Sequence, residues 1–372
     1  MSSRPIPFTI GIEEEYQLIN PITRALSSAA CSVLPILQRT SGDNIRSELN
    51  LSQVEAVTPV CHSLAEARRE VVHMRRAVIQ AAEQNGLGIA AAGTHPFSHW
   101  KDQGITPEQH YQHLADEYCQ LAFEPIFGFH VHVGLEDQAI ALQVMNRARS
   151  WLSILLALSA NSPFWLGEMT GYDSYRTLLW SQWPSSGPPS YFDSLQEYNA
   201  LAQSLVKAGL IDDPARIYWD IRLSARFKTI EFRVADVCLT VDETMMMTGI
   251  IRGLVRTCYE QEMCGEPVVA VRDELMRFAQ WNAARYGLSH ELIDVIEQQR
   301  YPAVILVERL LRLIRPALEA EGDWGEILSI VYDVLQRGNG ASRQRDAYHR
   351  RSCLEDVVDF NIAETSKGIV NK

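Results

Sequence analysis

The sequence lacks the features that would place the protein outside the cytoplasm. Its seven cysteines are odd in number and never have CxxC spacing, so neither a disulfide framework nor a zinc ribbon is predicted. We expect reduced, mostly buried thiols. The N-terminal residues MSSRPIPFTI do not have the charged and then apolar pattern of an export signal. The longest apolar run, 151–160, is about half a membrane span. These absences predict a cytoplasmic protein.

Positive charge and the common nucleotide motifs are also scarce. The formal net charge is -12 and the pI is near 5.4, which disfavours nucleic acids and anionic membranes as partners because such binding depends on clustered Lys and Arg. The chain has no Walker motif and no kinase glycine-rich loop, so another fold must hold any nucleotide. It also has no Ser/His/Asp or Cys/His pattern typical of a side-chain nucleophile.

No repeat, low-complexity tract or long linker divides the sequence, so residues 1–372 are predicted to form a single domain. Short segments rich in strand-forming residues and bounded by Gly, Pro or Asn predict strands. They lie at 7–18, 50–58, 87–92, 127–135, 216–223 and 229–236.

Helical patterns occupy the intervals between these strands. The strings SLAE from Ser63 and TVDE from Thr240 are capping boxes that predict helix starts, and Thr106 with a proline behind it predicts another. Residues 137–160 become apolar on all sides, which indicates a helix buried in the core. The stretch 180–194 is predicted to be a loop.

The C-terminal third, about 272–364, has an almost wholly helical pattern, with Pro302 as a start and Gly287 and Gly338 as stops. Strands grouped at hairpin-like spacing, without strict alternation with helices, favour an α+β fold. We expect a largely antiparallel sheet with helices packed on one face and chemistry on the other.

The string GIEEEYQL, residues 11–18, places three carboxylates where a strand would normally be apolar. Alternate side chains of a strand share a face, so Glu13 and Glu15 point one way and Glu14 the other. Two carboxylates about 7 Å apart on one face repel each other unless a positive group lies between them. A solvated edge strand that uses charge against aggregation is the ordinary explanation.

Four further segments carry polar pairs on one strand face. Each pair alone has an ordinary explanation, as packed histidines or as a local ion pair, but five such strands in one sheet would gather the charges on a single surface. The pairs are His130 and His132 in GFHVHVGL, Glu231 and Arg233 in KTIEFRVAD, Asp220 and Arg222 in RIYWDIRL, and Gln53 and Glu55 in SELNLSQVEAVTP, with Glu48 a short way upstream.

If these groups converge, they supply many hard oxygen ligands and imidazole nitrogen. That donor set is typical of a site for two or more Mg²⁺ or Mn²⁺ ions and not of a thiolate zinc site. Arginines beside the ions would suit phosphate oxygens, and phosphoryl transfer from ATP depends on such charge neutralisation. The groups concerned are Glu13, Glu15, Glu48, Glu55, Glu231 and a histidine, with Arg222, Arg226 and Arg233.

Several strings together resemble the type 2 glutamate-cysteine ligase family, also called the YbdK-type carboxylate-amine ligases. The resemblance covers about Phe8 to Tyr348 and implies a catalytic domain like that of glutamine synthetase. The strings are FTIGIEEEYQL, SQVEAVTPVC, AAAGTHPF, GFHVHVGL, SANSPFW, GYDSYRTLLWSQWP, IYWDIRL and EFRVADVCLTVDE.

The resemblance implies roles for individual residues. A first metal set would be Glu13, His130 and Glu231, and a second would be Glu15, Glu48 and Glu55. His132 would face the transferred phosphate as a catalytic group beside Arg222 and Arg233, and Arg176 and Arg226 would bind phosphate or the substrate carboxylate. Glu14 falls outside the pattern and is expected to be structural.

The implied activity is an ATP-dependent ligase that joins a carboxylate, most plausibly the γ-carboxylate of L-glutamate, to an amine such as cysteine through an acyl phosphate. A homodimer is the implied assembly. Two alternatives stay open: a metal-dependent amide hydrolase, which would turn over without ATP, and a non-catalytic regulator that binds Mg-ATP without releasing ADP.

Overall fold

The centre of the computed structural model, which describes residues 8–369 apart from the side chains of residues 40, 41 and 43, is a seven-stranded sheet. Its strand order is β2-β3-β1-β5-β9-β8, with β4 paired to the far end of β1, and every pair is antiparallel. The strands are β1 (Ile10–Ile19), β2 (Ile45–Ser47), β3 (Gln53–Val57), β4 (Gly88–Ala90), β5 (Gly128–Gly134), β8 (Ile221–Leu223) and β9 (Thr229–Asp236).

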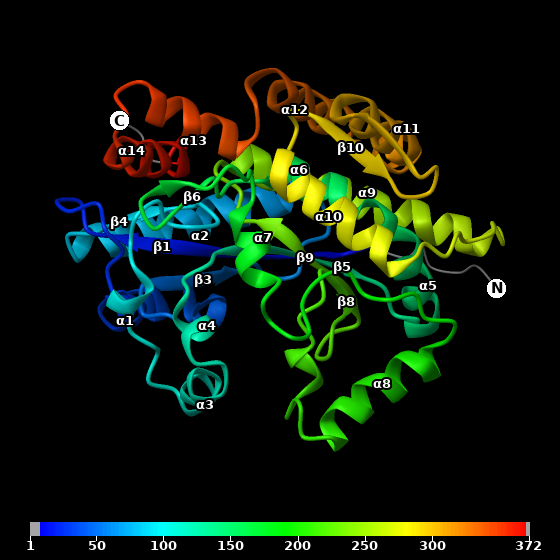
Figure 1. The fold of residues 1–372 in the computed structure, drawn as a ribbon, viewed down its shortest axis with the longest axis horizontal. Coiled ribbons are helices and arrows are strands. Elements are labelled where there is room, and N and C mark those ends of the chain that lie inside the picture. Colours follow the sequence, from blue (N-terminus) through cyan, green and yellow to red (C-terminus); the bar gives the residue numbers. More distant parts are fainter. Residues whose placement is uncertain (1–7, 370–372) are drawn as a thin grey trace.

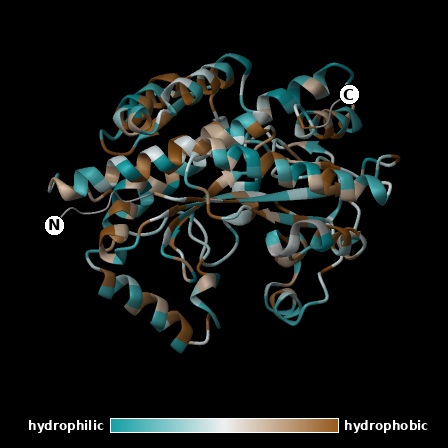
Figure 2. Cartoon of the chain, turned by 180° about the vertical axis from the view of Figure 1, so that it is seen from behind, coloured by the Kyte–Doolittle hydropathy of each residue, from teal (hydrophilic) through white to brown (hydrophobic). Residues whose placement is uncertain are grey.

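Most helices lie on one side of this sheet, whereas α3, α4 and α8 stand on the other side (Figure 1). Seen from behind, the helices carry both hydrophobic and hydrophilic residues, as helices that cover a sheet do (Figure 2). They are α1 (Ala30–Ser41), α2 (Leu64–Gln84), α3 (Gln109–Tyr118), α4 (Gln120–Phe123), α5 (Gln138–Ala148), α6 (Leu152–Ser159), α7 (Tyr175–Trp180), α8 (Leu195–Lys207), α9 (Val241–Met263), α10 (Asp273–Tyr286), α11 (Ala303–Glu321), α12 (Trp324–Arg337), α13 (Gly340–His349) and α14 (Leu354–Thr365).

The predicted α+β class with an antiparallel sheet is confirmed. Ser63 and Thr240 cap α2 and α9, and Gly287 and Gly338 end α10 and α12 as expected. The buried helix expected over 137–160 forms as α5 and α6, joined by a short 3-10 turn. One apolar cluster extends from Phe8 to Ile369, and the division into domains stays a prediction.

One expectation about local structure is wrong, and two hairpins were not predicted. The C-terminal third, which is otherwise helical as expected, contains the hairpin of β10 (Glu291–Asp294) and β11 (Gln299–Pro302), where Asp294 Oδ1 accepts from the backbone N–H groups of Ile296 and Glu297 and closes the turn. Thr106 does not begin a helix, since α3 starts at Gln109. Its hydroxyl donates to the backbone carbonyl of Glu48. A small hairpin, β6 (Phe164–Trp165) with β7 (Glu168–Met169), was also not predicted.

All seven cysteines are free, but only Cys61, Cys238 and Cys258 are buried, so the expectation of mostly buried thiols is wrong. Cys119 and Cys264 flank helix ends, where side chains face solvent. Among residues 8–369, none of the helices has the length and apolarity needed to cross a bilayer. Residues 1–7 lie outside the described part of the chain. The prediction that this segment has no export signal, and the start of the first predicted strand, fall on these residues.

The core face of β1 contains one buried charge, Glu14. Arg75 of α2 donates to its carboxylate through Nη2 (2.5 Å) and Nε (3.1 Å), and Thr244 of α9 adds a hydroxyl at 2.7 Å. Arg75 also reaches the carbonyls of Cys238 and Leu239. Because a buried charge is tolerated only when it is paired and hydrogen-bonded, this network lets strand β1 keep an acidic residue on its apolar side.

We predict that Arg75→Met lowers the free energy of unfolding by about 3–5 kcal/mol, because it leaves Glu14 as an uncompensated buried charge. The double variant Arg75→Met/Glu14→Gln should recover part of that loss. Arg68→Met, on the same helix, is the control, because its exposed ion pairs are worth about 1 kcal/mol or less. Urea unfolding measures all four proteins, and equal losses for Arg75→Met and Arg68→Met would contradict the account.

His95, in the AAAGTHPF string, stabilises the turn that follows β4 through three hydrogen bonds. Its Nε2 lies 2.9 Å from the carbonyl of Arg24, and its Nδ1 accepts from the backbone N–H groups of Phe97 (3.2 Å) and Ser98 (2.9 Å). The ring is therefore neutral with its proton on Nε2. Burial lowers the pKa of His95 from 6.5 to about 4.

A pH dependence follows from the lowered pKa of His95. The unfolded chain binds a proton below pH 6.5 whereas the folded chain stays neutral down to about pH 4, so stability falls as the pH drops through this window. Between pH 6.5 and pH 4 the free energy of unfolding of the wild type should fall by about 3 kcal/mol more than that of His95→Asn. The amide oxygen of the asparagine replaces Nδ1 as an acceptor but does not titrate. Chemical unfolding at pH 6.5 and 4 checks this, and parallel losses would contradict it.

Candidate functional site

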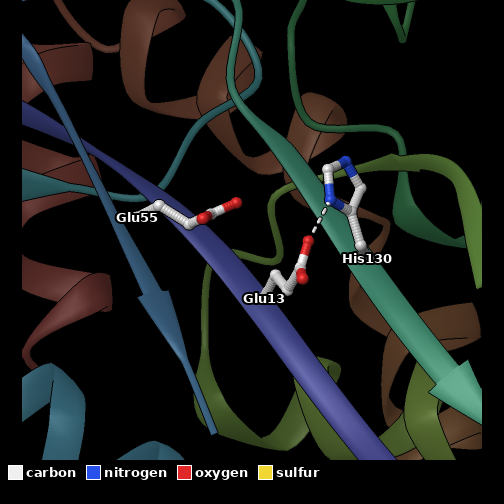
Figure 3. A group of neighbouring side chains, drawn as sticks. All are labelled: Glu13, Glu55 and His130. Atoms are coloured by element: carbon white, nitrogen blue, oxygen red, sulfur yellow. Dashed lines mark hydrogen bonds and ion pairs between the residues drawn. The ribbon is translucent and has the colours of Figure 1, made fainter. Parts of the chain in front are cut away.

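The register of the antiparallel strands brings the acidic and imidazole side chains together on the open face of the sheet. Glu13 is directly opposite His130, and Glu15 is opposite Glu55. Figure 3 shows Glu13, Glu55 and His130 converging from three adjacent strands, with Nδ1 of His130 2.8 Å from Glu13 Oε2. A slip of one residue would turn every one of these groups to the core, so the register fixes the site.

Three sets of potential metal ligands form on this face among the described residues. In each set the ligand atoms lie within 4.8 Å of one another. The sets are Glu13, Glu55 and His130; Glu13, His132 and Glu231; and Glu15, Glu48 and Glu55.

The sets differ in part from those that the motifs implied. The implied second set is one of the three groups. The implied first set is divided, because His130 shares a group with Glu55 whereas Glu231 shares one with His132. His132 lies opposite Glu231 in the strand register, which explains why these two are close. Glu13, between the two histidines, belongs to both groups.

Burial and mutual repulsion dominate the electrostatics of Glu48 and Glu55. Burial, followed by the charge of Glu15, raises the pKa of Glu48 from 4.5 to about 8. Burial, followed by the charges of Glu13, Glu48 and Glu15, raises the pKa of Glu55 well above its usual value. Carboxylates that resist ionisation in this way gain from a cation placed among them, because the cation offsets both effects.

Neighbouring groups hold these carboxylates in place. Glu15 accepts from Gln53 Nε2 (2.9 Å) and from the backbone N–H of Gly128 (2.5 Å). The position of Glu48 is fixed by the contact of Thr106 with its backbone carbonyl. A side chain at Gly128 would not fit, since its Cβ would lie 2.5 Å from Nη2 of Arg176. The glycine therefore allows Arg176 to approach the carboxylates.

The two histidines differ in environment. Burial, aided by Arg233, lowers the pKa of His130, so its imidazole is neutral. With Nδ1–H donating to Glu13, Nε2 keeps its lone pair and lies 4.0 Å from Glu15 Oε1. The Nε2 of His132 lies 3.4 Å from Glu13 Oε1. Burial favours the neutral ring, but the hydrogen bond with Glu13 and the nearby carboxylate charges outweigh burial and raise the pKa of His132. His132 thus points to a carboxylate and does not line the cavity described below.

The donor set fits divalent cations of the magnesium class. Its members are carboxylate oxygens and imidazole nitrogens without any thiolate, which is the preference of Mg²⁺ and Mn²⁺. Burial, and after it the charges of the neighbouring carboxylates, raise the pKa values of Glu48 and Glu55, and a cation would offset both. We infer that Glu13, Glu15, Glu48, Glu55, Glu231 and the two histidines would hold such ions.

Two arginines face the same cavity, Arg176 buried and Arg233 with a side chain that is 12% exposed. The guanidinium groups of Arg176 and Arg233 lie over the ring of Trp180, at 5.8 and 5.9 Å from its centroid. Arg233 Nη1 donates to Glu231 at 2.5 Å, whereas Arg176 Nη1 lies 3.9 Å from Asp236. Two guanidinium groups that line one cavity are suited to an anion.

The other two predicted arginines lie elsewhere. Arg222 donates to both oxygens of Glu231 (2.9 and 3.0 Å) and to the carbonyls of Ala215 and Ile217, so it fixes Glu231 and does not line the cavity. Arg226 is 71% exposed and lies 4.0 Å from Asp213 at the cavity wall. The structure therefore places Arg222 behind a carboxylate and Arg226 at the solvent-facing side of the site.

These groups line one cavity of about 910 Å³, closed on its other sides by α3 and by residues 212–216. Its volume is at the upper end for small-molecule sites and suits a nucleotide together with a second substrate. Among the residues that line it, Gln53 and Trp180 were not predicted as site residues. Gln53 shares a strand face with Glu55, and Trp180 lies one helical turn after Arg176, so spacing offered a signal for both.

Comparison with known proteins agrees with this fold. The model of "Glutamate-cysteine ligase family 2" matches residues 9–360. A protein of Rhodopirellula baltica named "Putative glutamate--cysteine ligase 2" is 43% identical, over 96% of this chain and 96% of its own. One of Frankia alni named "Putative glutamate--cysteine ligase 2-2" is 40% identical, over 96% of this chain and 97% of its own.

Solved structures share the fold at low sequence identity. Glutamate-cysteine ligase of Francisella tularensis, in complex with AMP, has a TM-score of 0.73 and 13% identity, over 96% of this chain and 88% of that one. The bifunctional glutathione synthetase of Pasteurella multocida also has a TM-score of 0.73, with 15% identity, over 97% of this chain and 53% of that one. The family match and the relatives confirm the resemblance drawn from the motifs, and the chain belongs to glutamate-cysteine ligase family 2 as an enzyme of the ligase class.

Proposed function

We propose that the protein is an ATP-dependent carboxylate-amine ligase that forms an amide through an acyl phosphate. One observation carries this proposal: a single cavity has crowded carboxylates on one wall and the guanidinium groups of Arg176 and Arg233 on the adjoining wall. The first wall suits divalent cations, and the second suits the oxygens of a phosphate or carboxylate. Phosphoryl transfer between two anions needs both.

The proposed reaction has two steps. An oxygen of the substrate carboxylate attacks the γ-phosphorus of ATP, an O–P bond forms, and the bond to the β-phosphate oxygen breaks with its electrons going to ADP. The nitrogen of a neutral amine then attacks the acyl carbon, inorganic phosphate leaves with the C–O bonding electrons, and the nitrogen gives up one proton to the departing phosphate or to water. Glu13, Glu15, Glu48 and Glu55 would hold divalent cations, which would supply positive charge against the phosphate groups. No side-chain nucleophile is required.

The residues of this chain position and neutralise the reactants. Arg233 and Arg176 would donate to the oxygens of the transferred phosphoryl group or of the substrate carboxylate, where negative charge develops. Arg222 donates to both oxygens of Glu231, and Oε1 of Glu231 also accepts from Nη1 of Arg233. Arg222 is therefore a positioning residue that acts through Glu231. Trp180 supports both cavity arginines by cation-π contact.

L-Glutamate is the proposed carboxylate substrate, because the relatives carry glutamate-cysteine ligase in their names. Cysteine is the amine that the same names suggest. A cytoplasmic location and a homodimer remain part of the proposal. A hydrolase that uses the same carboxylates would bind no phosphate group, so the guanidinium groups of Arg176 and Arg233 in the cavity favour the ligase. Release of ADP with Mg²⁺, L-glutamate and an amine tests the function, and turnover of an amide without ATP would overturn it.

The metal assignment predicts opposite effects for Glu55→Gln on binding and on stability. Calorimetric titration should show Mn²⁺ binding weakened about tenfold or more, since a ligand shared by two sets is lost. Without metal the variant should be at least as stable as the wild type, because it removes a buried, repelled carboxylate. Glu136→Gln, on the exposed surface, is the control.

Thermal unfolding in EDTA and in Mn²⁺ measures both effects. A Glu55→Gln variant that binds Mn²⁺ like the wild type would remove Glu55 from the ligand set. A variant that is strongly destabilised in EDTA would mean that the carboxylate serves the fold.

Arg233→Lys keeps the charge but loses the planar fork, so we expect ADP release to fall about 10²-fold or more while Mn²⁺ affinity changes little. The exposed Arg272→Lys is the matched control and should leave the rate unchanged. Initial rates of ADP formation check the prediction. A rate within a few-fold of wild type for Arg233→Lys would exclude the proposed contact with the phosphoryl or carboxylate oxygens.

A further inference from the structure

A second cavity, of about 550 Å³, lies next to the first and is not used by the reaction described above. We call it the tryptophan cavity because four of the chain's eight tryptophans line it, namely Trp180, Trp183, Trp219 and Trp281. The 180–190 loop and helix α10 form the rest of its wall. Trp180 and Trp183 line both cavities, so the two spaces meet at these rings.

Beside its indole N–H groups and hydroxyls, the tryptophan cavity has two buried acceptors that lie next to each other, Asp220 and Gln280. Asp220 is its one lining carboxylate, is almost fully buried and accepts from Gln280 Nε2 at 3.0 Å. That contact leaves Oε1 of Gln280, which is 5% exposed, without any hydrogen-bond partner. Two adjacent buried acceptors require a ligand that donates hydrogen, and a carboxylate beside indole rings favours a cation.

The charged groups around Asp220 are consistent with a cationic ligand at this carboxylate. Asp220 lies beside Arg233 across the β8–β9 pair, where the N–H of Arg233 donates to its backbone carbonyl at 2.8 Å. Burial raises the pKa of the Asp220 carboxyl to about 7, and the charges of Arg176 and Arg233 oppose that rise. Arg277 is the other charged residue of the lining and is exposed at the rim. An ammonium group at Asp220 would keep this carboxylate ionised.

L-Glutamate carries an ammonium group but no aromatic ring, and ATP carries an aromatic base but no cationic group, so neither matches both the acceptors and the indole rings. The phosphates of ATP and the carboxylates of L-glutamate are anions, which the acceptors Asp220 and Gln280 would repel. We propose that the tryptophan cavity binds the amine substrate, with its nitrogen at Asp220 and Gln280, and selects primary amines that carry an aromatic group for the indole rings. This inference rests on the proposed function and names the class of its second substrate. The side chain of cysteine is too small to contact the four rings together.

Binding of 2-phenylethylamine, measured by calorimetry without ATP, tests the inference directly. We expect the wild type to bind it about tenfold or more tightly than ethylamine, because only the former reaches the rings. Trp281→Ala should remove about fivefold or more of that affinity, and Asp220→Asn should weaken both amines. Phe278→Ala is the matched control, since Phe278 is an exposed aromatic on the same helix, 66% exposed, and does not line the cavity.

Equal affinity of the wild type for the two amines, or an unchanged affinity in Trp281→Ala, would overturn the inference. Weaker ATP binding in Trp281→Ala with unchanged amine binding would assign the cavity to the nucleotide and would also overturn it. Amine binding as expected, with no ADP release from any carboxylate and amine, would count against the proposed function instead. With L-glutamate present, ADP release should be faster with 2-phenylethylamine than with ethylamine.

Discussion

The crowding of four glutamates on one face of the sheet is the constraint on which the rest of the site depends. Glu13, Glu15, Glu48 and Glu55 are brought together by the pairing of β1 with its neighbours and by the segment before β3; Glu15 and Glu55 are buried, and Glu13 and Glu48 are half-buried. Burial of like charges costs free energy that a fold without function would avoid. The carboxylates therefore indicate a face built to receive cations, in agreement with membership of a ligase family.

The two-residue period of a strand lets the same segments serve stability and chemistry. On β1 the even positions face the core and the odd positions face the cavity. Glu14 is the exception on the core side, and Arg75 compensates it with a bidentate pair. On the open face Arg222 holds Glu231, and Glu231 holds Arg233, so the guanidinium that faces the cavity is oriented from behind. Sites on strands are more rigid than sites on loops, which suits chemistry that depends on positioning.

Much of this arrangement was predictable because alternation is local. The shared faces of Glu13 with Glu15 and of His130 with His132 follow from the period of two, and the helix caps at Ser63 and Thr240 follow from short-range chemistry. Which residues share a ligand set could not be predicted, because that depends on the strand register. His132 lies opposite Glu231, and Glu55 lies close to His130. Thr106 and Arg222 had the right residue types for a cap and a phosphate contact, but tertiary partners fixed them elsewhere.

The most direct test of the central claim is a crystal structure grown with Mn²⁺ and a non-hydrolysable ATP analogue, using the anomalous signal of manganese. The account predicts manganese peaks bonded to carboxylate oxygens of Glu15, Glu48 and Glu55 and of Glu13, with the phosphates on the same face of the sheet. Absence of manganese from this face, with these side chains turned into bulk water, would contradict it.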